Sequence, residues 1–239
     1  MTSPSPAIQI LRFATPAELA ADAARRWVAM LRENPGMGTA LPGGRIAGEF
    51  FRSAAARIRQ ESVEVGRAHF FWGDERCVGP EDPDSNFKLA NDGFLRELGV
   101  GASQIHRVRG ELAPDAAAAE AGRELLDWSK ATSDGQPVLD LVLLGMGEDG
   151  HVASLFPSAS PEVVESRAVY LAVTGPKPPP RRVTLGYRAL EAARNVWVLA
   201  SGAGKQAALV ASLESGRKTP LGRVLDARRQ TTIFTDIVG

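Results

Sequence analysis

The sequence is poor in cysteine and has no excess of either charge. Cys77 is the only cysteine among 239 residues, so the chain cannot form an internal disulfide. This agrees with a reducing compartment such as the cytoplasm. The 28 basic and 28 acidic side chains give a formal net charge of zero. That balance predicts no broad attraction to nucleic acid or to an acidic membrane, although it leaves room for a local basic pocket.

Long apolar runs are also missing. No stretch approaches the roughly 20 apolar residues of a membrane-spanning helix. The first residues, MTSPSPA, lack the basic and apolar regions of a secretory signal. We therefore expect a cytoplasmic protein without membrane contact, in which residues 1–7 form a flexible tail and residues 8–239 form one domain. The proline-rich stretch PKPPP, residues 176–180, is too short for a linker and predicts a rigid loop.

Histidine is scarce as well, and the chain has only three. No two of them have the spacing of metal ligands, so we predict no metal site. His69 and His106 lie in strand-like runs and are expected to be structural. Cys77 has no neighbouring base in the sequence, and we assign it no role. His151, at the end of a glycine-rich segment, is the remaining candidate for chemistry.

Segments typical of strands and of helices alternate along the chain. Strands are expected at residues 7–13, 39–41, 68–72, 104–108, 139–144, 168–173, 195–200 and 231–237. Helices are expected at residues 16–31, 46–59, 85–98, 114–130, 184–193 and 205–213. The run LDLVLL, residues 139–144, is continuously apolar, as buried parallel strands are. The alternation predicts an α/β fold: a single-domain, Rossmann-like, doubly wound and mainly parallel sheet with helices on both faces.

Polar or glycine-rich motifs directly follow four of the expected strands. They are Gly43-Gly44, Gly73-Asp74-Glu75-Arg76, Gly145 to His151, and Ser201-Gly202-Ala203-Gly204-Lys205. The carboxyl ends of parallel strands share one edge of a sheet, and ligands bind there. The four motifs are therefore expected to meet in one pocket.

The motif SGAGK favours an anion. It offers backbone N–H groups at a helix start, and Lys205 adds a full positive charge. It is not a P-loop, because Leu199 stands where a glycine is needed and Gln206 where a Ser or Thr is needed. A simple phosphate ester fits better than a nucleotide. An ordinary glycine turn with a solvated lysine remains an alternative.

Arg76 also has two interpretations. Its guanidinium can make a bidentate contact to phosphate or carboxylate. It can equally form an ion pair with Asp74 or Glu75, and an isolated DER triplet favours the ion pair. The triplet taken alone therefore predicts the ion pair.

The segment GMGEDGH, residues 145–151, matches G-x-G-x-x-G after a strand, but its context does not suit a nicotinamide cofactor. No long helix follows, and the next expected strand ends without an acid. The other interpretation is catalytic. Backbone N–H groups near Gly147 and Gly150 can face an oxyanion, and His151 can act as a general base. Asp149 can orient the histidine or stabilise its charged form. A histidine that merely bonds to the backbone at a helix start is the structural alternative.

Several motifs together resemble those of a known family. GMGEDGHVASLFP (residues 145–157), WGDERCV (72–78), DPDSN (82–86), PKPPPRRVTL (176–185) and SGAGK (201–205) are similar to the motifs of 6-phosphogluconolactonases, within the glucosamine-6-phosphate isomerase/6-phosphogluconolactonase family. The similarity runs in order through nearly the whole chain. It implies a Rossmann-like fold and hydrolysis of the small phosphosugar lactone 6-phosphoglucono-δ-lactone to 6-phosphogluconate. This is a step of the oxidative pentose phosphate pathway that needs no cofactor, and we expect a monomer or a weak dimer.

The resemblance also implies roles for individual residues. His151 becomes the catalytic base with Asp149 beside it, and Arg76 and Lys205 surround the substrate. Arg182 is a further phosphate contact. Gly43 and Gly44 are expected to bind the phosphate with these cations.

The loop after the second expected strand departs from the family. A Ser-Gly-Gly-Ser/Thr type of loop is usual there, but this chain has Pro42-Gly43-Gly44-Arg45. Pro42 has neither a hydroxyl nor an N–H group, and Arg45 replaces a second hydroxyl. Arg45 can restore the lost attraction for phosphate by its charge. This departure keeps a non-catalytic sugar-phosphate sensor as one alternative.

The related glucosamine-6-phosphate deaminase is the other alternative. Its histidine loop resembles GxGxDGHIAFNEP, with an acid soon after the histidine. Here the segment after His151 is VASLFP, and no acid follows until Glu162. This difference favours the lactonase.

Overall fold

A six-stranded parallel sheet forms the centre of the computed structural model, which describes residues 7–214 and 219–237. The strand order is β1-β11-β10-β7-β2-β3, and every neighbouring pair is parallel. The strands are β1 (Ala7–Arg12), β2 (Gly38–Leu41), β3 (His69–Trp72), β7 (Leu141–Gly145), β10 (Asn195–Ala200) and β11 (Gln230–Thr235). The expected α/β fold with a mainly parallel sheet is confirmed.

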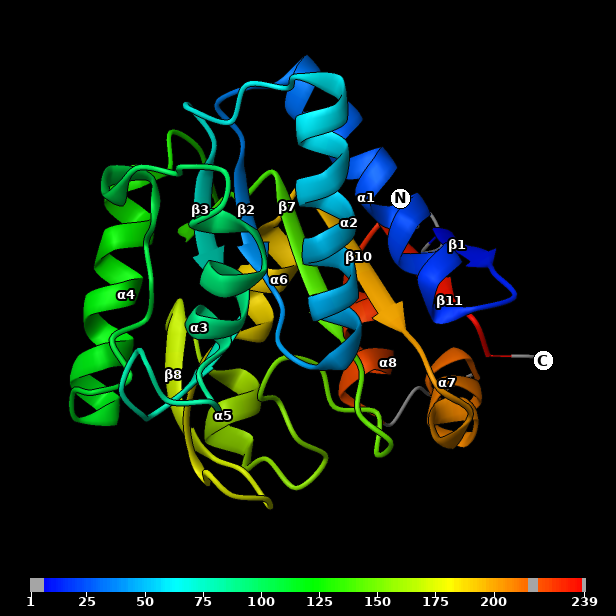
Figure 1. Ribbon diagram of the computed structural model, residues 1–239. Helices are drawn as coiled ribbons and strands as arrows, with labels where there is room; N and C mark the ends of the chain where they lie inside the picture. The colour runs from blue at the N-terminus through cyan, green and yellow to red at the C-terminus, as the bar shows by residue number, and fades with distance from the viewer. Residues whose placement is uncertain (1–6, 215–218, 238–239) are drawn as a thin grey trace.

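Helices cover both faces of this sheet. Figure 1 shows α1 and α2 in front of it and α6 and α8 behind it, with α4 at the side. The helices are α1 (Pro16–Glu33), α2 (Arg45–Glu61), α3 (Asn86–Ala90), α4 (Pro114–Trp128), α5 (Pro161–Glu165), α6 (Tyr187–Ala192), α7 (Gln206–Leu213) and α8 (Pro220–Ala227). None of those within the described ranges combines the length and the apolar character needed to cross a bilayer.

Local sequence explains the start of α1. The Thr15 hydroxyl accepts a hydrogen bond from the Glu18 amide at 3.2 Å, and Pro16 occupies the first helical turn. Leu19, Ala23 and Trp27 then recur at helical spacing and are fully buried against the sheet. The predicted tail, residues 1–7, falls outside the described residues except for Ala7, which begins β1.

A second, antiparallel sheet differs from the expected arrangement. It has the order β4-β9-β8 and consists of β4 (Asp74–Arg76), β9 (Arg181–Leu185) and β8 (Tyr170–Thr174). The strand expected at 168–173 is therefore outside the parallel sheet. Thr184 was expected to cap a helix, but it lies inside β9, where its side chain is fully buried, and α6 begins after Gly186. A two-stranded hairpin, β5 (Thr132–Ser133) and β6 (Gln136–Pro137), completes the strands in the described residues.

Three further differences concern short elements. The strand expected at 104–108 is wrong, because only one bridge joins Ile105 to Phe70 and a 3-10 turn covers Ala102–Gln104. The helix expected from residue 85 begins as α3 and continues as a π-helical turn over Asn91–Leu95. The short helices α5 and α8 were not expected, and a 3-10 turn, Ala203–Lys205, precedes α7.

The strand order creates a switch point between β2 and β7. After β2 the chain moves outward to β3, whereas after β7 it moves in the opposite direction to β10 and β11. Connections that leave in opposite directions open a crevice at the carboxyl ends of the two strands. Gly43-Gly44 and the segment from Gly145 to His151 follow these two strands, so the fold brings both motifs to that crevice.

Candidate active site

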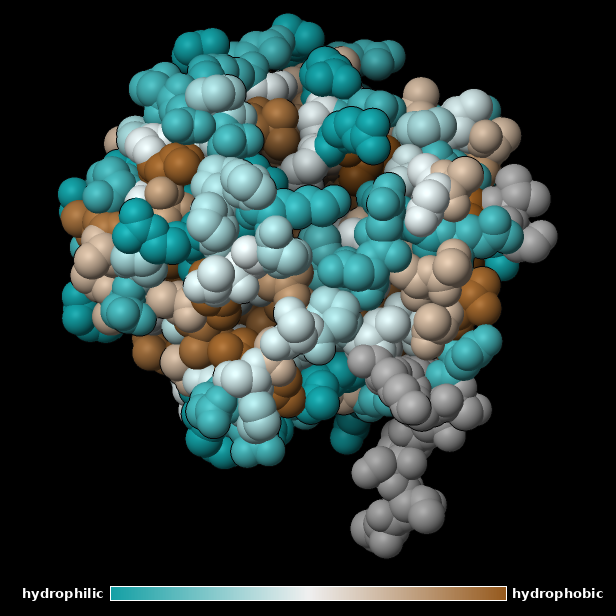
Figure 2. All heavy atoms as spheres, turned by 90° about the horizontal axis from the view of Figure 1, so that it is seen from below, coloured by the Kyte–Doolittle hydropathy of each residue, from teal (hydrophilic) through white to brown (hydrophobic). Residues whose placement is uncertain are grey.

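All four motifs line one cavity at the carboxyl ends of the parallel strands. The cavity has a volume of about 360 Å³. Its walls include residues from each motif: Gly43, Gly44, Arg76, Gly145, His151, Ser201, Gly202 and Lys205. Figure 2 shows this end of the molecule from below, with hydrophilic side chains across its middle and an apolar area to one side. The expected convergence is confirmed.

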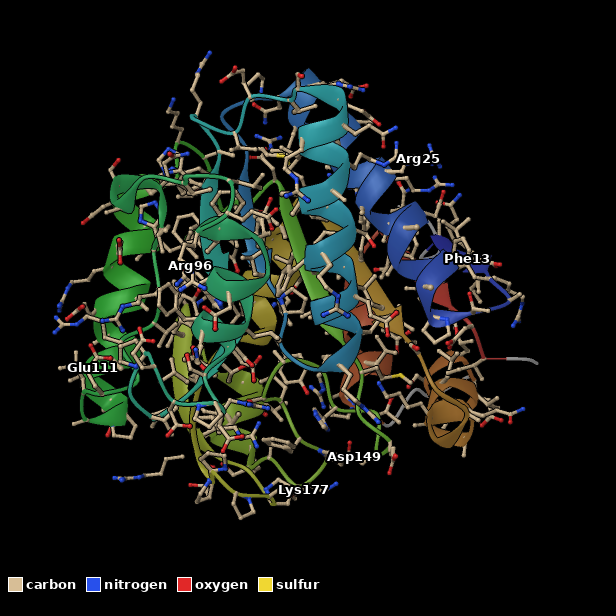
Figure 3. All side chains as sticks on the ribbon, viewed as in Figure 1. Phe13, Arg25, Arg96, Glu111, Asp149 and Lys177 are labelled. Carbon is tan, nitrogen blue, oxygen red and sulfur yellow. The ribbon has the colours of Figure 1, made fainter. Side chains whose placement is uncertain are left out.

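His151 and Asp149 form a hydrogen-bonded pair at this cavity. Nδ1 of His151 lies 2.6 Å from Oδ1 of Asp149, and the same oxygen accepts a hydrogen bond from the His151 amide at 3.2 Å. Figure 3 labels Asp149 at the lower end of the molecule, beyond the carboxyl ends of the strands. The His151 ring packs against Phe156 with centroids 4.9 Å apart, and the histidine side chain keeps 31 % of its surface exposed.

This contact fixes the chemical state of the pair. Burial on its own raises the pKa of Asp149, but the hydrogen bonds from the amide and ring of His151 outweigh it and hold the pKa below its usual value. The ionised carboxylate can only accept, so Nδ1 of His151 carries the proton. Nε2 is then the nitrogen with a free lone pair, which is the state a general base requires.

Gly147 is needed for the close approach of this pair. A Cβ atom at position 147 would lie 2.1 Å from Nδ1 of His151 and 2.7 Å from Oδ1 of Asp149. Gly150 has a φ of +79°, a conformation that residues with side chains rarely adopt. The two glycines therefore shape the turn that presents His151.

Backbone N–H groups near these glycines are expected to face an oxyanion, but the amides of Gly147 and Gly150 themselves are already engaged. The Gly147 N–H donates to the His151 carbonyl at 2.9 Å, and the Gly150 N–H donates to the Gly147 carbonyl at 3.1 Å. Both N–H groups thus already donate hydrogen bonds within the turn, and neither glycine lines the cavity. A different donor must face any charge that develops on a substrate.

Arg76 and Arg182 lie side by side on one wall of the cavity, opposite each other in the β4–β9 pairing. Burial and the nearby charge of Arg76 lower the pKa of Arg182. The Arg76 guanidinium donates to the Asp84 carbonyl at 2.6 Å, while its buried Nε has no partner. It forms no ion pair with Asp74 or Glu75 in the described structure, so the interpretation of Arg76 as an anion contact is the better one.

Lys205 and Arg45 contribute two more positive charges. Burial and the nearby charge of Arg45 lower the pKa of Lys205, while Asp236 and Glu148 act in the opposite direction. A bound anion would reverse the effect of these neighbouring cations. With Arg76 and Arg182 they make four cations among the described residues that line this cavity.

The amino end of α2 adds backbone donors beside Arg45. Gly44 caps the helix with a φ of +92° and without a side-chain hydrogen bond, and the first turn holds no acid. The first amides of a helix lack partners within the helix, and the helix dipole favours negative charge there. Gly43 must remain glycine, because a Cβ would lie 2.1 Å from Oδ1 of Asn86. This corner is suited to phosphate.

Asp74 is a cavity residue that the sequence reasoning did not assign. Oδ2 of Asp74 accepts a hydrogen bond from the Ser154 hydroxyl at 2.6 Å, and Oδ1 accepts one from Asn86 at 3.2 Å. Side chains alternate along a strand, so Asp74 and Arg76 of β4 share the side that lines the cavity. The spacing of two residues between Asp74 and Arg76 could have identified Asp74 as a cavity residue if DER had been recognised as a strand.

Glu75 points the other way and holds the start of α3. Its carboxylate accepts hydrogen bonds from the amides of Phe87, Asn86 and Arg76 at 2.7, 2.8 and 2.7 Å, and from the Ser85 hydroxyl at 3.0 Å. Burial nevertheless raises the pKa of Glu75 to about 7, against the effect of these donors.

A pH dependence of stability follows from Glu75. The folded state keeps its proton at pH values where the unfolded carboxyl, with a pKa of 4.5, has lost it. The free energy of unfolding should therefore fall as the pH rises from about 4.5 to about 7, by up to about 3 kcal/mol. Urea unfolding at pH 5 and pH 8 checks this. In Glu75→Gln the fall should be smaller by that amount, and equal falls in both proteins would contradict it.

The chain matches known proteins over most of its length. The family model described as glucosamine-6-phosphate isomerases/6-phosphogluconolactonase matches residues 13–234. A 6-phosphogluconolactonase of Mycobacterium tuberculosis is 38% identical over 199 residues, which cover 81% of this chain and 79% of that protein.

Solved structures agree with this match. A 6-phosphogluconolactonase from Trypanosoma brucei superimposes with a TM-score of 0.84 at 27% identity and covers 97% of both chains. A monomeric glucosamine-6-phosphate deaminase has a TM-score of 0.80 at 20% identity, with 95% of this chain and 96% of the other covered, which shows a shared fold alone. Since the family model spans nearly the whole chain and the relative exceeds a third in identity, this chain belongs to the glucosamine-6-phosphate isomerase/6-phosphogluconolactonase family.

Proposed function

We propose that the protein hydrolyses 6-phospho-D-glucono-1,5-lactone to 6-phospho-D-gluconate in the oxidative pentose phosphate pathway. The observation that carries the proposal is the His151–Asp149 pair on a cavity that also holds four cations. A general base beside a phosphate site suits the attack of water on the ester bond of a lactone that also carries a phosphate group. The substrate is an intracellular metabolite, so we place the protein in the cytoplasm. A monomer or weak dimer stays a prediction.

The phosphate is assigned to the amino end of α2. Gly43 and Gly44 bring the backbone close, Arg45 and Lys205 supply charge, and Arg182 completes the set. Binding energy from this remote group positions the lactone carbonyl for attack. Arg45 thereby replaces the hydroxyl donors that the loop lacks.

The chemical step is assigned to His151. Its Nε2 takes a proton from water while the oxygen of that water forms a bond to the lactone carbonyl carbon. The bond from this carbon to the ring oxygen then breaks, and the protonated His151 returns the proton to that ring oxygen. The product is a free hydroxyl and a carboxylic acid, which ionises. Asp149 stabilises the imidazolium that forms in between.

The charge on the carbonyl oxygen needs a donor other than Gly147 or Gly150. We assign it to Arg76, because this positively charged side chain lines the cavity. Stabilisation of such charge by a fixed donor is often a large part of catalysis.

A substrate comparison tests the reaction class. The purified protein is given the phosphorylated lactone, the same lactone without phosphate, and glucosamine 6-phosphate. We expect hydrolysis of the first, much weaker hydrolysis of the second and no ammonia from the third. Ammonia release would favour the deaminase, and saturable binding of the phosphorylated lactone without turnover would favour a sensor.

Arg45→Ala tests the assignment of the phosphate. Loss of one charged contact to phosphate should raise KM for the phosphorylated lactone by about tenfold or more, because such contacts contribute about 1.5–3 kcal/mol. The rate constant kcat should change little. Arg52→Ala is the matched control, since Arg52 is an exposed arginine on the same helix that does not line the cavity. An unchanged KM in Arg45→Ala would remove Arg45 from the site.

A further inference from the structure

A second cavity lies at the opposite end of the parallel sheet and has a volume of about 700 Å³. Its walls include residues at the amino ends of four strands: Gly36 before β2, His69 at the start of β3, Asp140 before β7 and Arg194 before β10. In Figure 1 these ends are at the top, whereas the candidate active site is at the bottom. The second cavity therefore shares no residue with the site described above.

The charges around this cavity are mostly positive. Arg67, Lys130 and Arg194 line it, and Asp140 is the one carboxylate among the lining residues that the structure describes. Asp140 is already engaged, because it accepts a hydrogen bond from the Gly38 amide at 2.9 Å and pairs with Arg194 at 3.3 Å. Within the described parts of the chain, Arg67 and Lys130 have no hydrogen bond or ion pair. Two cations are thus left without a counter-charge beside an open volume.

A chain of hydrogen bonds ends at the same cavity. Nδ1 of His106 lies 2.6 Å from Oε1 of Glu124, and Nε2 of His106 lies 2.9 Å from Nδ1 of His69. Packing holds both rings in place. The His106 ring stacks on Phe71 with ring centroids 4.3 Å apart, and the His69 ring packs against Trp128 with ring centroids 5.5 Å apart. His69 lines the cavity, and its Nε2 is the only ring nitrogen of the two histidines without a protein partner in the described structure.

The order of donors determines the state of that nitrogen. The Glu124 carboxylate only accepts, so Nδ1 of His106 carries a proton. In the neutral pair, Nε2 of His106 accepts from Nδ1 of His69, which leaves Nε2 of His69 without a proton. If the pair takes up one proton, Nε2 of His69 must carry an N–H, whichever ring holds the charge. Proton uptake therefore turns this atom from an acceptor into a donor.

From this arrangement we propose that the second cavity binds a small phosphate-bearing anion, held by Arg67, Lys130 and the protonated His69–His106 pair. The anion supplies the charge that the two unpaired cations lack, and it accepts a hydrogen bond from Nε2 of His69. This site is independent of lactone hydrolysis and does not depend on that proposal.

Binding at this site increases as the pH falls. Burial, with the nearby His106 and Lys130, lowers the pKa of His69, so the imidazole is neutral near pH 7. The groups around it are Arg67, Lys130 and Arg194 as cations and Asp140 as an anion, with Glu124 behind His106. A bound anion favours the protonated pair, and binding must therefore take up a proton. Affinity should rise from pH 8 to pH 6.

Imidazole NMR tests the proposal with inorganic sulfate as the probe, because sulfate has the shape of phosphate and keeps the same charge at pH 6 and at pH 8. The chain has only three histidines, so each ring signal can be assigned, and His151 reports separately on the active site. At constant ionic strength we expect a saturable change in the chemical shift of the His69 ring. The affinity should be about tenfold higher at pH 6 than at pH 8, which is the effect expected from one added charged hydrogen bond.

Variants identify the residues that bind. The double variant Arg67→Ala/Lys130→Ala should abolish the response of His69 and keep that of His151. Both side chains are exposed, so the fold should persist. Arg229→Ala is the control, an exposed arginine just before β11 that does not line this cavity. No saturable change at His69, the same affinity at both pH values, or an undiminished response in the double variant would each overturn the proposal.

Discussion

Replacing His151 with alanine is expected to lower kcat for lactone hydrolysis by about 10²–10⁴-fold, the usual contribution of a general base. The reason is geometric. His151 is oriented by a 2.6 Å contact to Asp149 and lines the same cavity as the cations assigned to phosphate. KM should change little, because the alanine variant keeps every residue of the phosphate site. Steady-state kinetics with the phosphorylated lactone measures both values.

Two controls separate this effect from a loss of structure. The His151 side chain is 31 % exposed, so His151→Ala should keep a thermal midpoint close to that of the wild type. Glu162→Ala removes the first acid after the histidine loop, a residue that does not line the cavity. It should hydrolyse the lactone at the wild-type rate. A kcat of His151→Ala within threefold of the wild type would take His151 out of the mechanism.

Gly147→Ala is expected to have the second largest effect, although it removes no functional group. The added methyl would lie 2.1 Å from Nδ1 and Cε1 of His151 and 2.7 Å from Oδ1 of Asp149, far inside contact distance. The histidine must turn away or lose its contact with Asp149. We expect kcat to fall by about 10²-fold or more, since displacement of a general base forfeits most of its contribution.

Gly79→Ala is the matched control for this substitution. A Cβ atom at position 79 meets nothing within 4 Å, and the residue does not line the cavity. It should therefore leave kcat unchanged. The His151 ring signal in NMR should move in Gly147→Ala and stay in place in Gly79→Ala. A Gly147→Ala enzyme with wild-type kcat would show that the close packing of Asp149 and His151 is unimportant.

The location of the site could be predicted from the sequence because it depends on strands that are easily identified. The apolar run at residues 139–144 indicates a buried parallel strand, and the motif that ends in His151 follows it directly. Parallel strands end at one edge, so four motifs after four such strands had to meet.

The second sheet could not be predicted in the same way. Its strand β4 is the charged triplet DER, and β9 begins with two arginines, so neither has an apolar pattern of its own. They pair only because the tertiary structure brings residues 74–76 and 182–184 together. The roles of Arg76 and Asp74 depend on that pairing, which explains why the isolated triplet favoured an ion pair for Arg76 and why Asp74 was not assigned.

The function of the glycines was also beyond the sequence. Glycine allows a donor amide to approach a ligand, but it also allows two side chains to approach each other. The sequence favoured the first role for Gly147. In the structure the Gly147 N–H donates to the His151 carbonyl. The absence of a side chain at this position is what allows Asp149 and His151 to approach each other.

The rate of lactone hydrolysis shows whether this protein is a lactonase that uses His151 as its base. Glucose 6-phosphate and its NADP-dependent dehydrogenase generate the lactone in place, and a second coupled dehydrogenase reports 6-phosphogluconate as it appears. We expect the wild-type protein to accelerate this appearance well above the spontaneous rate, and His151→Ala to accelerate it about 10²–10⁴-fold less. A wild-type rate equal to the spontaneous rate would contradict this expectation.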